Sequence, residues 1–223
     1  MKTIIASKLK CFSNVIVITY AMLLWITIGD IMMELGSLSA KYESNGNPGA
    51  ISTGVGDKGG KSYGMYQLSL ATGALAGYIA SSAYKEEFNG IALGSDKFDA
   101  VWRAIAQRDP AGFRSDQRTY HTKVYYTPVR RYATSINIPN TEAINQVIWS
   151  MSTQHGPRWA KSILELCVGY SETETIKKIY ELRTAQFMNS SYYGSSTSRK
   201  RVRDSVINRF KKELQDALRM TTS

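Results

Sequence analysis

The feature that most constrains the fold is one irregular stretch in a chain that otherwise carries helical patterns. Residues 44–62 (SNGNPGAISTGVGDKGGKS) are rich in Gly, Ser, Asn and Pro, which favour turns and loops over regular helices. Long loops are uncommon inside a domain, and those that occur are usually functional. The stretch therefore predicts a long loop or a short hairpin that interrupts a helical domain.

Helical patterns lie on both sides of this stretch. Residues 30–43 repeat apolar side chains at helical spacing, and Asp30 can cap the helix. Further helices are expected at residues 64–80, 96–108, 111–126, 140–153, 158–168, 172–187 and 199–219. Breaks are expected at Asp109-Pro110 and Thr127-Pro128, because the residue before a proline avoids the helical region. The fold class is therefore mostly α.

The chain is basic but lacks the patterns of nucleic-acid-binding modules. It has 223 residues, of which 43% are hydrophobic, and a formal net charge of +10. A basic surface suits any polyanion, including nucleic acid, anionic lipid and a bacterial cell wall. Zinc-type spacings, RNP-like aromatics and basic heptads are not found, so nucleic acid is not expected as a partner.

Two cysteines, Cys11 and Cys167, lack the spacing of a metal site, and no metal is expected. A disulfide between them in an oxidising compartment and two unpaired thiols both remain open.

The N-terminal segment predicts membrane targeting. Residues 1–10 carry three lysines and no acid, and residues 11–29 carry no charge. Such a run is just long enough to cross a bilayer, which needs about 20 residues. The preceding lysines favour a cytoplasmic N-terminus and an exported body. A permanent or releasable signal anchor fits better than a cleaved signal peptide, and a buried helix of the domain remains an alternative. We therefore expect residues 1–29 as a targeting segment and residues 30–223 as the domain.

Glu43 is the first candidate for a catalytic group. It stands at the end of the predicted helix 30–43, where the chain enters the irregular stretch. A carboxyl group there can lean against Tyr42, Tyr63 or Tyr66. Partial desolvation by such neighbours raises the pKa of a carboxyl group, as a general acid near neutral pH requires. Cleavage of a glycosidic bond needs an acid of this kind to protonate the leaving oxygen.

Three segments together resemble a known enzyme family. Residues 43–52 (ESNGNPGAIS) resemble the signature E-S-x-x-x-P-x-A-(I/V)-S of soluble lytic transglycosylases and goose-type lysozymes. Residues 63–67 (YGMYQ) resemble the G-(L/M)-x-Q element that follows in that family. Residues 149–157 (WSMSTQHGP) resemble the A-Y-N-A-G block of the same family, and more closely its Q-H-G variant.

The resemblance implies a lysozyme-like α-helical domain that cleaves the β-1,4 bond between N-acetylmuramic acid and N-acetylglucosamine in peptidoglycan. It implies no cofactor and makes Glu43 the catalytic acid. The substrate-binding residues implied are Ser62, Tyr63, Gly64, Tyr66, Gln67, Gln154 and His155. The chain departs from the family in a longer stretch before residue 62 and in lacking the Tyr-Asn pair of the third block.

The resemblance leaves two mechanisms open. Asp57 follows Glu43 by fourteen positions, a spacing like that of the auxiliary acid in goose-type enzymes. In an inverting lysozyme this second carboxylate activates water. In a lytic transglycosylase the hydroxyl of the muramic acid attacks instead, and no second carboxylate is needed. We slightly favour the transglycosylase, because Asp57 lies in a loop.

Ordinary structural roles compete with these assignments. Asp57 fits a turn beside glycines, Gln67 a capping amide, and His155 a structural histidine. Trp102, Trp149 and Trp159 are expected in the core, because aromatic side chains dominate cores. The helix at 199–219 is expected to dock its apolar face and to leave its basic face in solvent.

The biological setting is a separate expectation. A lytic domain behind a weak anchor resembles phage endolysins that the host exports to its inner membrane and periplasm, acting as a monomer on the wall. A virion-associated entry enzyme and a bacterial wall-remodelling enzyme are alternatives. So are a glycosidase of chitin or chitosan, and a non-catalytic wall-binding protein.

Overall fold

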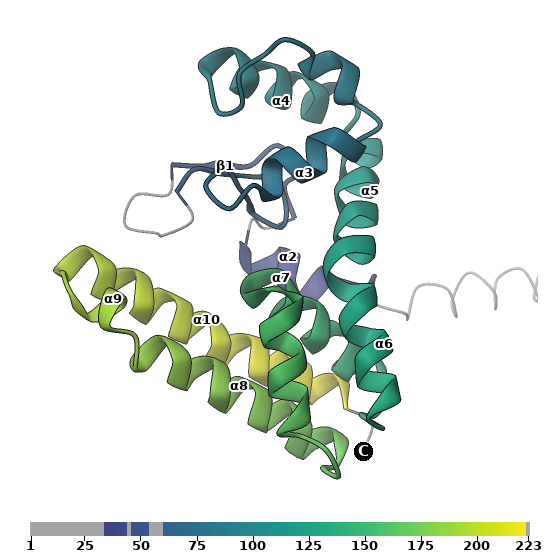
Figure 1. Ribbon diagram of the computed structural model, residues 1–223, viewed down its shortest axis with the longest axis vertical. Helices are drawn as coiled ribbons and strands as arrows, with labels where there is room; N and C mark the ends of the chain where they lie inside the picture. Colours follow the sequence, from purple (N-terminus) through teal and green to yellow (C-terminus); the bar gives the residue numbers. More distant parts are fainter. Residues whose placement is uncertain (1–33, 44–45, 54–59, 222–223) are drawn as a thin grey trace, which may run out of the picture. The chain divides into compact units, whose positions relative to one another are not determined.

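Helices account for most of the described chain, as the sequence predicts. The computed structural model describes residues 34–43, 46–53 and 60–221 (Figure 1). The α-helices are α2 (Ser37–Glu43), α3 (Ala74–Ser81), α4 (Asp96–Arg108), α5 (Pro110–His121), α6 (Thr127–Ser135), α7 (Glu142–Glu165), α8 (Glu172–Met188), α9 (Ser191–Gly194) and α10 (Thr197–Met220). A 3₁₀ turn, η1 (Lys85–Phe88), precedes α4, and a π-helical turn, η2 (Thr122–Tyr126), joins α5 to α6.

The predicted N-terminal hydrophobic helix, and the domain boundary at residue 29, lie outside the described residues. Within those residues, no helix combines the length and apolar character needed to cross a membrane.

The irregular stretch forms a small antiparallel sheet. Strands β1 (Ile51–Ser52), β2 (Ser62–Tyr63) and β3 (Leu68–Ser69) pair in that order, with Tyr63 opposite both Ile51 and Leu68. The expectation of a short hairpin is confirmed. The helix expected over 64–80 is wrong before residue 74, because Gly64, Gln67 and Gly73 all have positive φ angles that a right-handed helix excludes.

Two prolines have different effects on neighbouring helices. The break at Asp109-Pro110 is confirmed: Asp109 ends α4 and caps α5 by accepting a hydrogen bond from the N–H of Gly112 at 2.9 Å. The break at Thr127-Pro128 is wrong. The N–H of Thr127 bonds the carbonyl of Thr122, five residues back, so one wide π turn carries the helix past the proline.

The helices expected at 140–153 and 158–168 form one kinked element, α7. Its backbone leaves helical geometry at Gly156, where φ is 80° and ψ is 158°. Pro157 follows and has no N–H to donate to the preceding turn, so the kink occurs where a helical bond is missing in any case. The kink separates the buried first part of α7 from a second part that packs through Ala160, Ile163 and Leu164.

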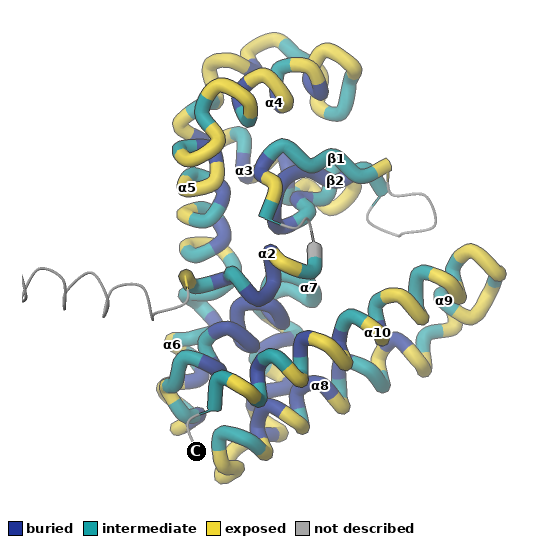
Figure 2. Tube along the Cα trace, turned by 180° about the vertical axis from the view of Figure 1, so that it is seen from behind, coloured by how far each residue is buried: buried dark blue, intermediate teal, exposed yellow. Residues whose placement is uncertain are grey.

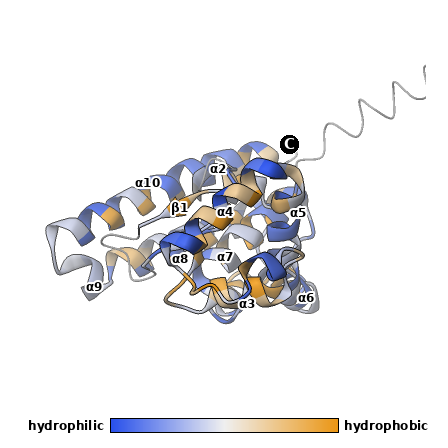
Figure 3. Ribbon diagram, turned by 90° about the horizontal axis from the view of Figure 1, so that it is seen from above, coloured by the Kyte–Doolittle hydropathy of each residue, from blue (hydrophilic) through white to orange (hydrophobic). Residues whose placement is uncertain are grey.

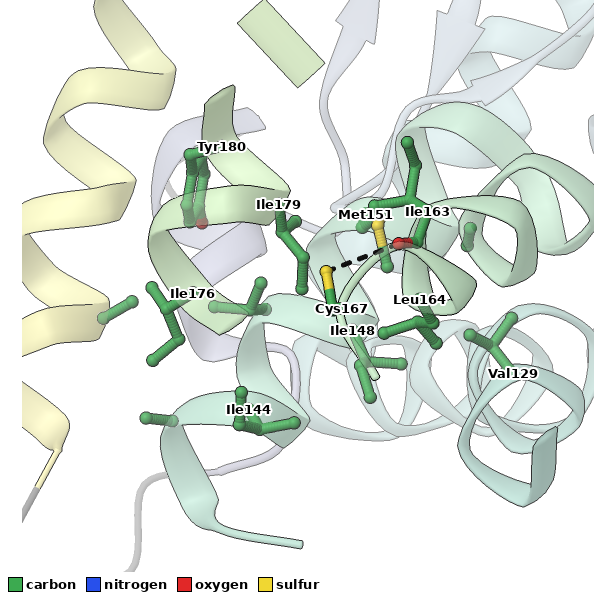
Figure 4. Packing of buried hydrophobic residues seen from close by; sticks show 14 of the residues in the cluster. Val129, Ile144, Ile148, Met151, Ile163, Leu164, Cys167, Ile176, Ile179 and Tyr180 are labelled. Carbon is green, nitrogen blue, oxygen red and sulfur yellow. Dashed lines mark hydrogen bonds between the residues drawn. The ribbon is translucent and has the colours of Figure 1, made fainter. Parts of the chain in front are cut away.

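Two large hydrophobic clusters, and a third small one of Ala40, Met65, Tyr66 and Trp149, support the described part of the fold. The helical cluster is formed mainly by α6, α7, α8 and α10, and Figure 4 shows Ile144, Ile148 and Met151 beside Ile176 and Ile179. The second cluster packs Phe98, Phe113 and other aromatic rings around Trp102. Burying each large apolar side chain contributes roughly 1.5–3 kcal/mol.

The tryptophans lie where the sequence predicts. Trp102 and Trp149 are fully buried, and Trp159 packs partly buried against the helical cluster. Figure 2 shows how buried and exposed residues alternate along α8 and α10. The amphipathic docking of α10 is also confirmed, because Ile207, Phe210 and Ala217 are buried while its lysines are exposed. The hydropathy colouring of Figure 3 alternates along this helix accordingly.

Candidate functional site

A cleft of about 810 Å³ lies between the small sheet and the helices α7 to α10. The sheet side contributes Ser52, Ser62, Leu68 and Ser69, and the helical side contributes the segment 153–156 at the kink of α7. Further lining residues come from α2, α5, η2, α8, α9 and α10: Tyr42, His121, Tyr125, Phe187, Tyr193, Val202, Val206 and Arg209. Segments far apart in the sequence therefore share one cavity.

The structure brings together most of the residues that the sequence predicts for substrate binding. Ser62, Tyr66 and Gln67 line the cleft from the sheet side, and Gln154 and His155 line it from α7. The two motif segments are almost ninety residues apart in sequence, yet they face the same cavity. Their contact with a substrate remains a prediction.

Tyr63 and Gly64 do not line this cleft. The ring of Tyr63 is fully buried in the Trp102 cluster, and its hydroxyl donates to Asp99 at 2.6 Å. Gly64 has a φ of 77°, and a Cβ at this position would clash with the amide of Gln117. Both residues therefore support the turn that presents the cleft residues.

Gln67 is fixed by its own turn. Its amide oxygen accepts from the Ser62 hydroxyl at 2.7 Å, and its amide nitrogen donates to the carbonyl of Gly64 at 3.0 Å. The backbone φ of 50° is unusual for a side chain of this kind. Gln67 thus has a local structural role and also contributes to the cleft wall.

The candidate acid Glu43 is the last residue of α2, and the residue before it lines the cleft. This helix end is held firmly. Tyr42 donates to Asp216 of α10 at 2.7 Å, and Lys41 bonds the same carboxylate at 2.7 Å. The Glu43 side chain and the whole of Asp57 lie outside the described part of the chain, so their catalytic roles remain predictions.

A buried ion pair lies behind Gln154 and His155. Arg183 of α8 and Glu213 of α10 have no exposed surface, and the guanidinium Nη1 is 3.2 Å from the carboxylate. Arg183 also donates to Gln154 Oε1 at 2.7 Å and to His155 Nε2 at 3.4 Å. Burial, with the nearby charges of Arg183 and Arg209, holds the pKa of His155 well below its usual range. His155 is therefore neutral and also structurally bonded.

Sequence reasoning missed Arg183 and Glu213. Charged residues inside an amphipathic helix usually face solvent, and these two are thirty positions apart, so their spacing carries no signal.

His121 is a third residue that the sequence did not single out. It ends α5, is 2% exposed, and touches the cleft. Its ring lies 4.5 Å from that of Tyr66 and stacks on Tyr125 at 4.8 Å. Among the described residues, neither ring nitrogen has a hydrogen-bond partner. Burial lowers the pKa of this histidine to about 3.

In the described residues, no three His, Cys, Asp or Glu side chains are arranged to hold a metal ion. Cys167 is a free, buried thiol whose Sγ lies 3.4 Å from the carbonyl oxygen of Ile163 (Figure 4). Its possible partner, Cys11, falls outside the described residues.

Comparison with known families identifies the chain. Residues 35–214 match the family described as the type VI secretion system spike protein VgrG3-like C-terminal domain. The chain belongs to this family. It is 41% identical over 140 residues to the type VI secretion system spike protein VgrG3 of Vibrio cholerae serotype O1 (strain ATCC 39315 / El Tor Inaba N16961). The match covers 60% of this chain and only 14% of that much longer protein.

Solved structures identify the fold of this VgrG3-like domain. The native chitosanase of Bacillus subtilis MY002 superposes with a TM-score of 0.62 at 17% identity, covering 82% of this chain and 87% of that chain. A mutant of that chitosanase, complexed with 6 GlcN, gives a TM-score of 0.57 at 16% identity with the same coverage. The predicted lysozyme-like, mostly helical fold is thereby confirmed, and these chitosanases share it.

Because His121 is buried and neutral, we expect the folded protein to lose stability in acid. The unfolded chain binds a proton at this residue below pH about 6.5, whereas the folded chain does so only near pH 3. The free energy of unfolding should therefore fall as the pH drops below 6.5, by about 1.4 kcal/mol per pH unit from this residue. Between pH 7 and pH 5, wild type should lose about 2 kcal/mol more than His121→Phe in urea unfolding.

Tyr125→Phe is the matched control, because it alters the same aromatic cluster without removing a group that titrates in this window. It should show the wild-type dependence on pH. Equal losses in wild type and His121→Phe would contradict the assignment of a neutral, buried His121.

Proposed function

We propose that this VgrG3-like domain is a glycosidase that cleaves the β-1,4 bond between N-acetylmuramic acid and N-acetylglucosamine in peptidoglycan. The observation that carries the proposal is the cleft in a glycoside hydrolase fold. Ser62, Tyr66 and Gln67 line one side, Gln154 and His155 line the other, and the helix that ends at Glu43 adjoins it. Residues from the motif segments thus line the cavity.

In this proposal Glu43 is the general acid. Its proton passes to the glycosidic oxygen as the bond from that oxygen to the anomeric carbon breaks, so the leaving sugar departs as a neutral alcohol. The anchoring of α2 through Lys41 and Tyr42 supports the role, because a general acid must stay within hydrogen-bond reach of the scissile oxygen.

The group that attacks the anomeric carbon defines the enzyme class. A water molecule activated by Asp57 gives a lysozyme and a reducing muramic end. The C6 hydroxyl of the same muramic residue gives a lytic transglycosylase and an anhydro end. We favour the transglycosylase, because the acid Glu43 alone suffices for it and no second carboxylate is needed.

A glycosidase of chitosan is the alternative that a specific observation favours, since the two structural neighbours are chitosanases and one is complexed with 6 GlcN. A non-catalytic wall-binding domain is the other alternative. Release of soluble fragments from purified peptidoglycan, or from chitosan, separates the three.

For the biological setting, the family favours action on a bacterial envelope in connection with a type VI secretion spike. The relatives described above include no phage protein, so a phage endolysin or a virion enzyme has only the sequence resemblance behind it. Membrane attachment through residues 1–29 likewise remains a proposal.

Glu43→Gln tests the assignment of the general acid. The substitution keeps size and hydrogen bonding but removes the transferable proton, so wall cleavage should fall by about 10²- to 10⁴-fold. Release of soluble muropeptides from purified peptidoglycan measures it. Glu86→Gln, an exposed residue of η1 away from the cleft, should retain full activity. Undiminished cleavage by the Glu43 variant would defeat the assignment.

Asp57→Asn distinguishes a lytic transglycosylase from a lysozyme. For a transglycosylase, activity should stay within about threefold of wild type, because the role of a water-activating base is not required. Mass spectrometry should then find mainly anhydromuramic ends. Asp204→Asn, at an exposed position of α10, controls for the lost charge. A loss comparable to that of Glu43→Gln, together with reducing ends in the wild-type products, would establish a lysozyme instead.

Deletion of residues 1–29 tests whether this segment brings the protein to the cell wall. Bacteria expressing the full chain should lyse only if it reaches the periplasmic side, where the wall lies. Deletion of residues 1–29 should prevent lysis, and an added signal peptide should restore it, but not in the Glu43→Gln background. Lysis by the truncated chain without any signal would show that export does not depend on residues 1–29.

A further inference from the structure

Gln154 and His155 meet the cleft on one side and a buried arginine on the other. They lie on the turn of α7 just before the Gly156 kink, and both line the cavity. Behind them Arg183 directs Nη2 at Gln154 Oε1, at 2.7 Å, and Nε at His155 Nε2, at 3.4 Å. One guanidinium therefore bonds two adjacent residues of the cleft wall.

Arg183 is itself held from several directions. Its Nη1 pairs with Glu213 at 3.2 Å, and its Nη2 also donates to the Ser150 hydroxyl at 3.1 Å. Its central carbon lies 4.2 Å from the ring centroid of Phe210, a cation–π contact. The side chain is completely buried. The orientation of the guanidinium is therefore fixed before any substrate arrives.

This arrangement determines which atoms the two residues offer to the cleft. A guanidinium has only donors, so the atoms that face it must be acceptors. Gln154 must turn its oxygen towards Arg183, which leaves the amide NH₂ for other partners. His155 Nε2 must carry a lone pair, so in the neutral ring the proton is on Nδ1. Both residues consequently keep hydrogen-bond donors, not acceptors, on the sides that face away from Arg183.

One further side chain of the described wall offers donors only. Arg209 of α10 also lines the cleft and lies 3.4 Å from the inner carboxylate of Glu213. Among the residues of the lining that the structure describes, none is Asp or Glu. A sugar that carries an ammonium group finds no counter-charge among them. A sugar that carries a carbonyl or carboxylate oxygen finds donors.

We propose that Arg183 is a positioning residue that makes Gln154 and His155 donors to a substrate carbonyl or carboxylate oxygen, and that this wall thereby selects N-acetylated amino sugars over glucosamine. The inference rests on the proposed function and specifies its substrate class. The acceptor oxygen belongs to an acetamido group or to the lactyl carboxylate of muramic acid. A glucosamine polymer has neither the acetamido group nor the lactyl carboxylate.

Gln154→Glu tests the proposal without removing Arg183. The side chain has the same shape, and it can still accept from the guanidinium, but it presents an acceptor to the cleft. Binding is measured by calorimetry on the full chain carrying Glu43→Gln, with tetramers of N-acetylglucosamine and of glucosamine and with the N-acetylglucosamine–N-acetylmuramic acid disaccharide. The substitution should weaken binding of an acceptor-bearing probe by about tenfold and leave glucosamine binding equal or tighter.

The probes distinguish the source of the acceptor. Weaker binding of the N-acetylglucosamine tetramer assigns the donors to an acetamido carbonyl, whereas weaker binding of the disaccharide alone assigns them to the lactyl carboxylate. Gln186→Glu, the same change at an exposed position of α8, should alter none of these affinities. Equal changes for all three probes, or none, would overturn the proposal.

A spectroscopic measurement tests the positioning role directly. The chain has only two histidines, and His121→Phe identifies their signals. In protein with ¹⁵N-labelled histidine, His155 should be the neutral Nδ1–H tautomer, and Arg183→Lys should reduce its population, because a single ammonium group cannot bond both neighbours. An Nε2–H tautomer in wild type would overturn the proposal even if the lysine variant does not fold.

These outcomes are independent of wall cleavage. A chain that fails to release muropeptides but prefers acetylated probes through Gln154 retains this inference and loses the proposed function. A chain that cleaves the wall without that preference retains the proposed function and loses this inference.

Discussion

The fold around the cleft depends on one buried ion pair, between Arg183 of α8 and Glu213 of α10. Taking two charges out of water costs free energy, and the attraction between them offsets this cost only where the geometry is good and further hydrogen bonds are made. Here Glu213 also accepts from Ser150 of α7 and Tyr180 of α8, so three helices meet at one carboxylate. Loss of either charge would leave the other buried and unpaired, at about 3–5 kcal/mol. The pair therefore fixes the helices and, through Gln154 and His155, the cleft wall.

The sequence carries much of this fold, because its signals are local. Helices with clear caps were predicted within two residues, as in α8, where Ser171 and Glu174 form a capping box. The failures have local physical causes. Positive φ angles at Gly64, Gln67 and Gly73 exclude the helix that an apolar, Ala-rich pattern suggested. At Pro128 a π turn keeps the helix continuous where a proline normally ends it.

In the candidate site, too, local motifs predicted some residues, whereas others are recognised only from tertiary contacts. The motifs predicted five residues that line the cleft, because they lie on short segments with a recognisable order. They could not distinguish those from Tyr63 and Gly64, whose neighbours in sequence face the cleft while they face Asp99 and Gln117. Arg183 and His121 carry no local signal. Their roles arise from tertiary contacts, with Gln154 in one case and with Tyr66 in the other.

A shared fold does not decide the substrate, because function resides in the residues of the site. This chain and the chitosanases share a scaffold at 17% identity or less, so the helical framework tolerates nearly complete replacement of side chains. Gln154 and His155 bond inward to Arg183 and outward border the cavity, so they couple the core to the lining. Because Arg183 also bonds Glu213 of α10 and Ser150 of α7, a change in the guanidinium would affect both the packing of these helices and the atoms that Gln154 and His155 offer to the cleft. The proposed selectivity for acceptor-bearing sugars therefore depends on a residue of the core as well as on the residues of the cleft surface.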